Sequence, residues 1–398
     1  MRILFAAPPA FGVLLPIVPL VWAARAAGHE TALATTSSMT DVAADAGLSV
    51  IDVFPDRQRW AALTGWRMRP EDLPGDAPPE VRNALGIRAP FAMFTATMTD
   101  GTLAAAREFA ADLIVTTGDH PAGLIAAAAA GLPVLEVGNR VSWSARDASW
   151  KQRPAMVPEG VLAPLLDRLA LAEVRPEVLA RIDPRPPSMG GLVDDEPDSD
   201  DGVPWWSMQY VPYNGGAVVP PWALTPGDRP RVGVTLGTVV PMISGTTSLG
   251  VVIEALGDLD VDVVLAAGTA DLSGLGELPG NVRSVGYLPL SVFLPTCDLV
   301  VHHGGSGTTA APLFYGVPQL VLPGFADNPL SAQRVVERGV GLAHDPATID
   351  VGIVRDLVER LLSEPIFRQQ AAQVRAEMAT QPSPAVIIDR LQNGLAAR

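Results

Sequence analysis

The sequence predicts an α/β protein built from two Rossmann-like, doubly wound domains with parallel sheets. The chain has 398 residues, about twice the usual length of one domain. Short apolar runs of strand-forming residues alternate with longer Ala- and Leu-rich runs, a pattern that is typical of parallel β/α units. A Pro-rich, acidic stretch over residues 183–230 separates two such series and is interpreted as the interdomain linker.

The first series, residues 1–182, is expected to form one domain. Its predicted strands are Arg2–Ala7, Thr31–Thr35, Ser49–Val53, Leu113–Thr117 and Pro133–Val137. Its predicted helices lie near Pro16–Ala27, Thr40–Ala46, Phe91–Ala111 and Ala122–Ala130. The first apolar run could be read as a secretory leader, but prolines interrupt it, so a strand and a helix explain it better. Residues 54–89 have little periodicity and predict a long functional loop.

The second series, residues 231–380, repeats the same alternation. Its predicted strands are Val232–Leu236, Val261–Ala266, Val282–Val285, Leu299–His302 and Gln319–Leu322. Its predicted helices lie near Leu249–Leu256, Ser291–Thr296, Thr308–Tyr315 and Leu330–Arg338. Residues 381–398 are expected to form a last helix that packs back toward the first domain. Ligands of such domains bind at the carboxyl ends of the strands, which here would face each other across a cleft.

Composition excludes several functions. The formal net charge of −15 argues against nucleic acid and anionic membrane surfaces as partners. Apart from the interrupted first run, no stretch approaches the roughly 18 apolar residues of a membrane span. Cys297 is the only cysteine, so no disulfide can form within the chain. A reducing, cytoplasmic location is therefore expected.

The most informative motif is His302-His303-Gly-Gly-Ser-Gly-Thr-Thr309, which follows an apolar strand and opens a helix. Glycines permit a tight turn, and the amides of Ser306, Gly307 and Thr308 would be free at a helix N-terminus, where an anion is favoured. The motif lacks the lysine of a phosphate-binding Walker loop and differs from the dinucleotide-binding Gly-x-Gly-x-x-Gly pattern. It predicts a cradle for a diphosphate.

Residues 298–341 resemble the donor-binding region of inverting UDP-glycosyltransferases. The matching parts are the histidine–glycine motif, Gly316-Val-Pro-Gln, Pro323, Asp327-Asn328 and Gly339-Val-Gly. Closer resemblance is to bacterial glycosyltransferases that attach dTDP-deoxysugars to polyketides. The segments that carry it are Arg25–Glu30, Tyr210–Gly215, Val232–Thr238 and Pro382-Ser-Pro384. Matching segments extend from residue 1 to about residue 390, and the implied fold is GT-B.

The resemblance implies a donor site in the second domain. His303 would donate to the diphosphate with the three amides, and Thr238 would contact a phosphate. Leu288 would lie where main-chain groups hold the pyrimidine, and Asn214 would lie at the hinge beside the donor. Asp327 and Asn328 would bind sugar hydroxyls, with Asn in place of the commoner Gln. His302 would face the core.

The expected chemistry needs no metal and no cofactor beyond the dTDP-sugar co-substrate. Negative charge develops on the diphosphate as the bond to the sugar breaks, and fixed amides and an imidazolium stabilise that charge. The run Asp198-Ser-Asp200 lies in the linker and is interpreted as a solvated acidic loop.

The usual catalytic base is missing. In the resembled family a histidine stands three residues before the proline that opens the first helix, and a later aspartate orients it. Those positions hold Val13 and Thr117 here. Glu136 is the first candidate for a replacement because it ends a predicted strand, and the adjacent Asp119 and His120 are the second. Asp56 in the long loop is the third.

The first half of the chain is expected to bind a bulky acceptor. All 8 tryptophans precede residue 223, and some are expected to line a pocket for a flat apolar molecule. The candidates for acceptor binding are Val13, Trp60, Trp66, Arg140 and Trp143.

The leading hypothesis is an inverting transferase that moves a deoxysugar from a dTDP donor to an aromatic polyketide in antibiotic biosynthesis. Loss of both the usual histidine base and the aspartate that orients it favours a C-glycoside. Three alternatives stay open: an O-glycosyltransferase with a relocated base, a nucleotide-sugar-binding protein without turnover, and a sugar-nucleotide epimerase. The sequence leaves a homodimer and an auxiliary protein open as partners.

Overall fold

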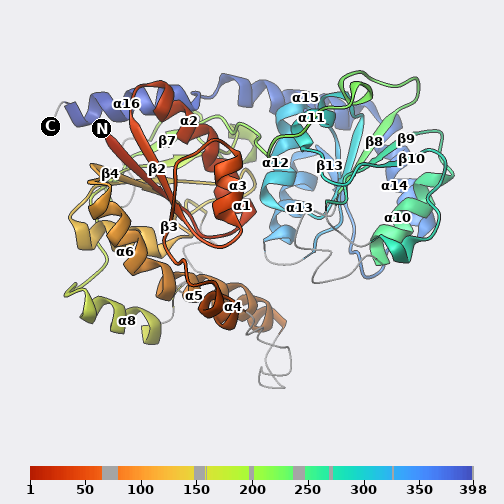
Figure 1. The fold of residues 1–398 in the computed structure, drawn as a ribbon. Helices are drawn as coiled ribbons and strands as arrows, with labels where there is room; N and C mark the ends of the chain where they lie inside the picture. Colours follow the sequence, from red (N-terminus) through yellow and green to blue (C-terminus); the bar gives the residue numbers. More distant parts are fainter. Residues whose placement is uncertain are drawn as a thin grey trace.

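The computed structural model describes residues 1–64, 79–147, 157, 159–196, 201–235, 247–268, 272–324 and 327–396. Two domains lie side by side, each with a parallel sheet between helices (Figure 1). The first domain is drawn at the left of that view and the second at the right.

The first sheet has seven parallel strands in the order β3-β2-β1-β4-β5-β6-β7. Their bounds are β1 Arg2–Ala6, β2 Glu30–Thr35, β3 Val50–Asp52, β4 Leu113–Thr116, β5 Val134–Val137, β6 Val178–Asp183 and β7 Trp205–Ser207. The helices of this half are α1 Phe11–Leu14, α2 Val18–Ala26, α3 Met39–Asp45, α4 Arg57–Thr64, α5 Pro79–Glu108, α6 Pro121–Ala130 and α8 Glu159–Arg168. Short 3₁₀ turns are η1 Leu15–Ile17, η3 Pro187–Met189 and η4 Pro221–Leu224. Strand order reverses between β1 and β4, which makes that end the switch point of the sheet.

The second sheet has six parallel strands in the order β10-β9-β8-β11-β12-β13. Their bounds are β8 Arg231–Thr235, β9 Asp262–Leu265, β10 Val282–Ser284, β11 Leu299–His302, β12 Gln319–Val321 and β13 Gly341–Ala343. The helices are α10 Thr247–Gly257, α11 Leu290–Phe293, α12 Ser306–Tyr315, α13 Asn328–Arg338, α14 Val351–Ser363, α15 Pro365–Thr380 and α16 Pro384–Ala396. Turns η5 Ser273–Leu275 and η6 Leu294–Thr296 complete it. Here β8 and β11 flank the switch point.

Each of the ten predicted strands corresponds to a strand of the structure, whereas β6, β7 and β13 were not expected. β7 lies within residues 183–230, so part of the stretch interpreted as linker belongs to the first sheet. β6 carries Arg181 and Asp183, which break its apolar pattern. The range 54–89, expected to be a loop, contains α4 and the start of α5. The Asp56 carboxylate accepts a hydrogen bond from the amide of Arg59 at 2.9 Å, which supports the first turn of α4.

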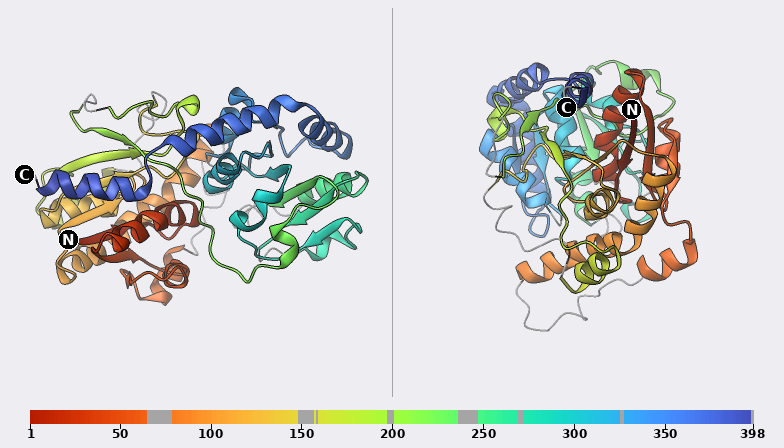
Figure 2. Two further views of the ribbon diagram at one scale, coloured as in Figure 1. Left: turned by 90° about the horizontal axis from the view of Figure 1, so that it is seen from above. Right: turned by 90° about the vertical axis from the view of Figure 1, so that its left-hand side faces the viewer.

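The last helix, α16, runs across the first domain, while α15 lies along the second (Figures 1 and 2). Ile387, Ile388 and Leu391 of α16 are buried in the same apolar core as α2 and the first sheet. The first domain therefore contains the end of the chain as well as its beginning.

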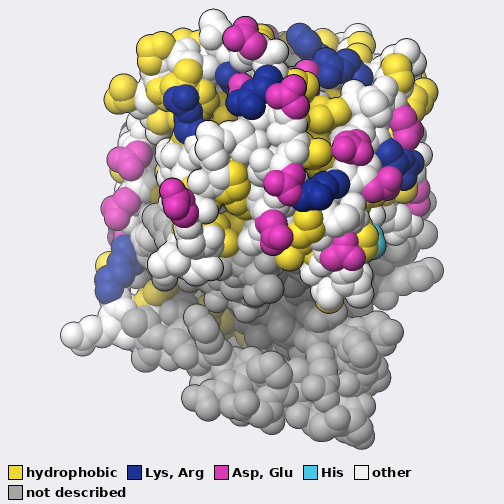
Figure 3. All heavy atoms as spheres, turned by 90° about the vertical axis from the view of Figure 1, so that its right-hand side faces the viewer, with side chains coloured by type: hydrophobic (Ala, Val, Ile, Leu, Met, Phe, Trp, Pro, Cys, Tyr) yellow, Lys and Arg dark blue, Asp and Glu magenta, His cyan; other side chains and the backbone are white. Residues whose placement is uncertain are grey.

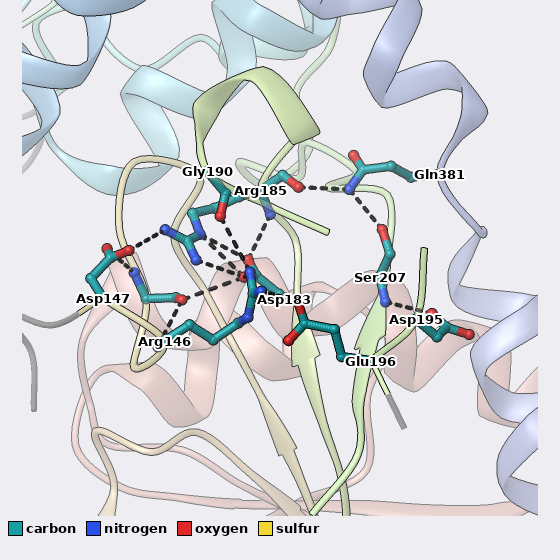
Figure 4. A network of polar contacts seen from close by, with 10 residues as sticks. Arg146, Asp147, Asp183, Arg185, Gly190, Asp195, Glu196, Ser207 and Gln381 are labelled. Carbon is teal, nitrogen blue, oxygen red and sulfur yellow. Dashed lines mark hydrogen bonds and ion pairs between the residues drawn. The ribbon is translucent and has the colours of Figure 1, made fainter. Parts of the chain in front are cut away.

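A buried polar network fixes the point where the chain returns to the first domain (Figure 4). Arg185 is fully buried and pairs with Asp183 and Asp147, both at 2.8 Å. Its carbonyl oxygen accepts a hydrogen bond from the side chain of Gln381 at 2.9 Å, and Gln381 also donates to the hydroxyl of Ser207 at 3.1 Å. The turn between α15 and α16 is thus bonded to the ends of β6 and β7.

The two domains also share an apolar core. Val141, Met189 and Tyr210 of the first half pack in one cluster with buried residues of α12, α13 and α15. On the outer face of the second domain, acidic and basic side chains are interspersed with apolar ones (Figure 3).

Candidate functional site: a cleft between the two domains

A cavity of about 500 Å³ lies between the domains at the carboxyl ends of both sheets. The first domain contributes the loop after β1 with α1, and the start of α3. The second contributes the segments that follow β8, β9, β10, β11 and β12. Strand ends from two switch points therefore converge on one cavity, as expected for a doubly wound architecture.

The turn from β11 into α12 forms one wall of this cavity. Gly304 has φ +85°, and a Cβ there would lie 2.9 Å from the carbonyl oxygen of Asn328. A Cβ on Gly305 would lie 2.3 Å from Nε2 of His303. Gly305 is the N-cap of α12 and provides no side-chain cap. Space and conformation thus require glycine at 304, whereas a side chain at 305 would displace the imidazole of His303. The first turn of the helix faces the cavity through Ser306, Gly307 and Thr308.

The two adjacent histidines of this turn have different environments. His302 is fully buried: its Nε2 lies 2.7 Å from the side-chain oxygen of Gln319, and its Nδ1 accepts a hydrogen bond from the amide of Gly304 at 3.0 Å. The expectation that His302 faces the core is confirmed. His303 lines the cavity, and its buried Nδ1 has no partner within the described residues.

Burial lowers the pKa of His303 to about 4, although Asp327 opposes the shift. The imidazole is therefore neutral at pH 7 in the ligand-free protein. The imidazolium expected from the sequence belongs to the state with a diphosphate bound and stays a prediction. A bound diphosphate would supply the negative charge that raises this pKa again.

Asp327 and Asn328 follow β12 and line the same cavity. Oδ2 of Asp327 accepts hydrogen bonds from Nε of Arg140 at 2.7 Å, from the indole of Trp143 at 3.1 Å and from the hydroxyl of Ser306 at 3.3 Å. The first two partners come from the first domain, so this carboxylate connects the two halves. Arg140 lines the cavity too. Trp143 does not line it but contacts Asp327 and Arg140, which do.

The lining of the cavity also includes Asn214, Tyr287 and Leu288. The hydroxyl of Tyr287 donates to the main-chain oxygen of Asn214. The side-chain oxygen of Asn214 is buried without a partner among the described residues. Sequence reasoning identified Asn214 and Leu288 but missed Tyr287, whose position directly before Leu288 could have indicated it.

The wall from the first domain is apolar at the position of the usual base. Val13 lines the cavity, with Phe11 and Gly12 beside it and Met39 near by. Phe11 and Met39 were not expected there. The sequence offered little indication of them, because an apolar residue that faces a cavity has the same pattern as one that faces the core.

Glu136 does not line this cavity. Its carboxylate lies 3.5 Å from Nε of Arg181 and borders a separate pocket of about 60 Å³. Burial raises the pKa of Glu136, although Arg181 opposes the shift. The structure thus places the first candidate base beside a cation in the first domain and away from the main cavity.

The second pair of candidates is also outside the main cavity. Asp119 is buried and is ion-paired with Arg140. His120 is buried, its Nε2 has no partner among the described residues, and burial lowers its pKa to about 3. Asp56, the third candidate, caps α4.

The expected tryptophans are distributed differently from the prediction. Trp60 is buried and stacks on Phe94, with ring centroids 5.9 Å apart and planes 5° from parallel, in contact with the long helix α5. It does not line the cavity. Thr238 and Trp66 lie outside the described residues.

No group of three or more His, Cys, Asp or Glu that could hold a metal ion occurs in the described part of the chain. Among the same residues, no helix combines the length and apolar character that crossing a membrane requires.

Comparison with known proteins gives the class of this molecule. Its structure is similar to that of the glycosyltransferase SsfS6 from Streptomyces sp. SF2575, crystallised with thymidine diphosphate. The TM-score is 0.78, with 32% identity over 99% of each chain. The elloramycin glycosyltransferase ElmGT of Streptomyces olivaceus is 35% identical over 98% of this chain and 97% of its own. The 10-deoxymethynolide desosaminyltransferase of Streptomyces venezuelae is 33% identical over 94% and 93%.

Two parallel α/β domains with a cleft between them and these similarities define a glycosyltransferase of the GT-B fold. Residues 22–237 match the N-terminal domain of the family of erythromycin biosynthesis protein CIII-like proteins, and residues 250–393 match its C-terminal domain. The chain belongs to this family of natural-product glycosyltransferases.

Proposed function

We propose that this glycosyltransferase moves a deoxysugar, with inversion, from a dTDP-sugar to a ring carbon of a phenolic, aromatic polyketide. The donor lies against the second domain and the acceptor against the first. The ring carbon bonds to C1 of the sugar, dTDP departs, and the ring loses a proton to restore its aromaticity.

The donor half of the proposal rests on the turn at the start of α12. The free amides of Ser306, Gly307 and Thr308 and the side chain of His303 would bind the departing diphosphate. The pyrimidine would lie near Leu288 and Asn214. The crystallised relative with thymidine diphosphate supports this nucleotide.

The part of the proposal that concerns the acceptor rests on one observation. Among the described residues, the first-domain wall of the cavity contains neither a carboxylate nor an imidazole, and Val13 stands at the place of the usual base. An aliphatic alcohol would need such a base for attack. A phenol has a pKa of about 10 and ionises far more readily, which makes its ring carbons nucleophilic without strong help from the protein.

The linkage can be tested directly on the product. After incubation with a dTDP-deoxysugar and a phenolic polyketide, a C-glycoside should keep its sugar through mild acid hydrolysis, and its anomeric carbon should show one-bond coupling to a ring carbon. A sugar released by acid would contradict the carbon linkage and support O-glycosylation. Absence of dTDP release with a panel of aromatic acceptors would contradict the proposed substrate class.

Glu136 provides a second test of the same proposal. Because its carboxylate is paired with Arg181 outside the cavity, Glu136→Gln should change kcat by less than about 3-fold. The measurement is steady-state dTDP release at saturating acceptor. A loss of about 100-fold or more with unchanged donor affinity would show that Glu136 is the base after all.

A further inference from the structure

Arg140 connects the first domain to the part of the cavity that the second domain lines. It follows β5, lines the cavity and pairs with Asp327 at the start of α13 at 2.7 Å. On its other side it pairs with Asp119, in the loop after β4. One guanidinium therefore bridges two carboxylates that belong to different domains.

The first domain fixes this guanidinium from several directions. Nη1 donates to the side-chain oxygen of Asn139 at 2.8 Å as well as to Asp119. The Trp143 ring lies beneath it, 4.2 Å from the guanidinium carbon to the ring centroid. Asn139 in turn donates to the carbonyl oxygen of Gly12 at 3.1 Å, which links Arg140 to the acceptor wall. Such a planar, multiply bonded cation is preorganised to receive Asp327.

Asp327 is held through one of its two oxygens. Arg140, Trp143 and Ser306 all donate to Oδ2. Apart from the amide of Asp327 itself, which also bonds this carboxylate, no described residue donates to Oδ1. Asp327 lines the cavity. Burial acts to raise the pKa of Asp327, but its bonds with Arg140 outweigh that effect and keep the pKa below its usual value. The carboxylate thus stays ionised, with one oxygen left to accept bonds from a ligand.

We infer that Arg140 is a positioning residue for the donor sugar: it holds the Asp327 carboxylate across the domain boundary so that Oδ1 meets the sugar hydroxyls. This inference rests on the proposed donor site. It adds a role for the first domain in recognition of the sugar, since two of the three groups that orient Asp327 come from that domain. The nucleotide, bound at α12 and near Leu288, does not depend on Arg140.

The discriminating measurement is the affinity for dTDP-deoxysugar compared with that for dTDP alone, by calorimetry without acceptor. A charge-assisted hydrogen bond of the kind that Asp327 would offer corresponds to about 10- to 100-fold in affinity. Arg140→Gln should therefore weaken dTDP-sugar binding about 10-fold or more and leave dTDP binding within about 2-fold. In turnover, the KM for the donor should rise more than kcat falls.

Arg140→Gln leaves the buried Asp119 and the partly exposed Asp327 without their cation. A second variant therefore controls for misfolding. Arg140→Lys keeps the charge but cannot hold Asp119 and Asp327 together through a planar fork. It should lower the affinity for dTDP-sugar by at least about 3-fold with a melting temperature near that of the wild type. The matched control is Arg334→Gln, which removes another bond across the domains, from Nε to the carbonyl oxygen of Ser142 at 3.2 Å, outside the cavity.

The outcomes separate this inference from the proposed function. Equal dTDP-sugar affinity in wild type and both Arg140 variants would overturn the inference alone. Equal weakening of dTDP and dTDP-sugar, or the same selective loss in Arg334→Gln, would assign Arg140 a purely structural role and would also overturn it. If wild-type protein bound neither ligand, the proposed donor site itself would be wrong and the inference would fail with it.

Discussion

At the scale of single residues, His302 and His303 adjoin in the chain but have opposite surroundings. His302 is bonded to Gln319 inside the second domain, and His303 faces the cavity with one nitrogen buried and unpartnered. The sequence motif predicted this division. It could not predict that burial keeps His303 neutral in the free protein, because a pKa depends on packing that no short motif contains.

His303→Ala should lower kcat about 100-fold, because it removes a donor to the charge that develops on the departing diphosphate. Stopped assays of dTDP release at saturating donor and acceptor give the rate. A matched control is His344→Ala, which changes a histidine outside the cavity and should leave kcat unchanged. A His303→Ala enzyme with wild-type kcat would contradict the proposed site.

Glu136 and Asp119 show that a position near the end of a strand does not by itself identify a catalytic base. Glu136 does lie in β5 near its carboxyl end, as expected, but its side chain points to Arg181 of the next strand. Asp119 is paired with Arg140. The hydrophobic pattern of the sequence places a residue on a strand. Which pocket its side chain borders depends on partners that are distant in sequence.

At the scale of elements, the turn before α12 combines steric and chemical requirements. A Cβ on Gly305 would lie 2.3 Å from Nε2 of His303, although the backbone there, with φ −61° and ψ 147°, suits any residue. Gly305→Ala should thus displace the imidazole without straining the chain. We expect dTDP affinity to fall about 10-fold by calorimetry with a nearly unchanged melting temperature. Unchanged dTDP affinity would mean that His303 does not contact the nucleotide.

The helix α14 offers a test of a local signal that has no connection to the site. Oδ1 of Asp350 accepts a hydrogen bond from the amide of Ile353 at 2.8 Å and caps the helix. Asp350→Ala should lower the free energy of unfolding by about 1 kcal/mol, measured in urea, while kcat stays unchanged. Asp350→Asn, which can cap equally well, should restore most of that loss. Equal stability of the Ala and Asn variants would rule out a capping role.

The longer apolar strands were predictable, whereas β6 was missed because charged residues interrupt its apolar pattern. β6 contains Arg181 and Asp183, and Asp183 is fully buried because Arg185 pairs with it. In the sequence, the charged residues of a buried ion pair cannot be distinguished from charged residues on the surface. β7 was hidden for another reason: it is three residues long, and beyond its pairing with β6 it forms a single antiparallel bridge, from Trp205 to Glu196.

At the scale of the whole molecule, three neutral histidines couple folding to pH. Burial, as the largest cause, lowers the pKa of His120 and His302 to about 3 and that of His303 to about 4. An unfolded histidine has a pKa of about 6.5, so below that pH the unfolded chain binds protons that the folded chain excludes. These histidines should lower the free energy of unfolding as pH decreases from about 6.5 toward 4, by up to about 4 kcal/mol per pH unit.

Urea unfolding at about pH 7.5, 6.5 and 5.5 measures this dependence. Replacing His120 by Gln should make the slope shallower, since it removes one of the groups that take up a proton on unfolding. The same free energy of unfolding at about pH 5.5 as at pH 7.5 would show that these histidines take up protons in the folded protein.

The burial of α16 in the first domain has a consequence for synthesis and for engineering. Because Ile387, Ile388 and Leu391 complete the core around β1 and α2, the first domain cannot finish folding during synthesis until α16 has emerged from the ribosome. For the same reason, a chimera that takes the first domain of this enzyme has to include residues 384–396. A simple exchange at the middle of the chain would join that core to a foreign helix.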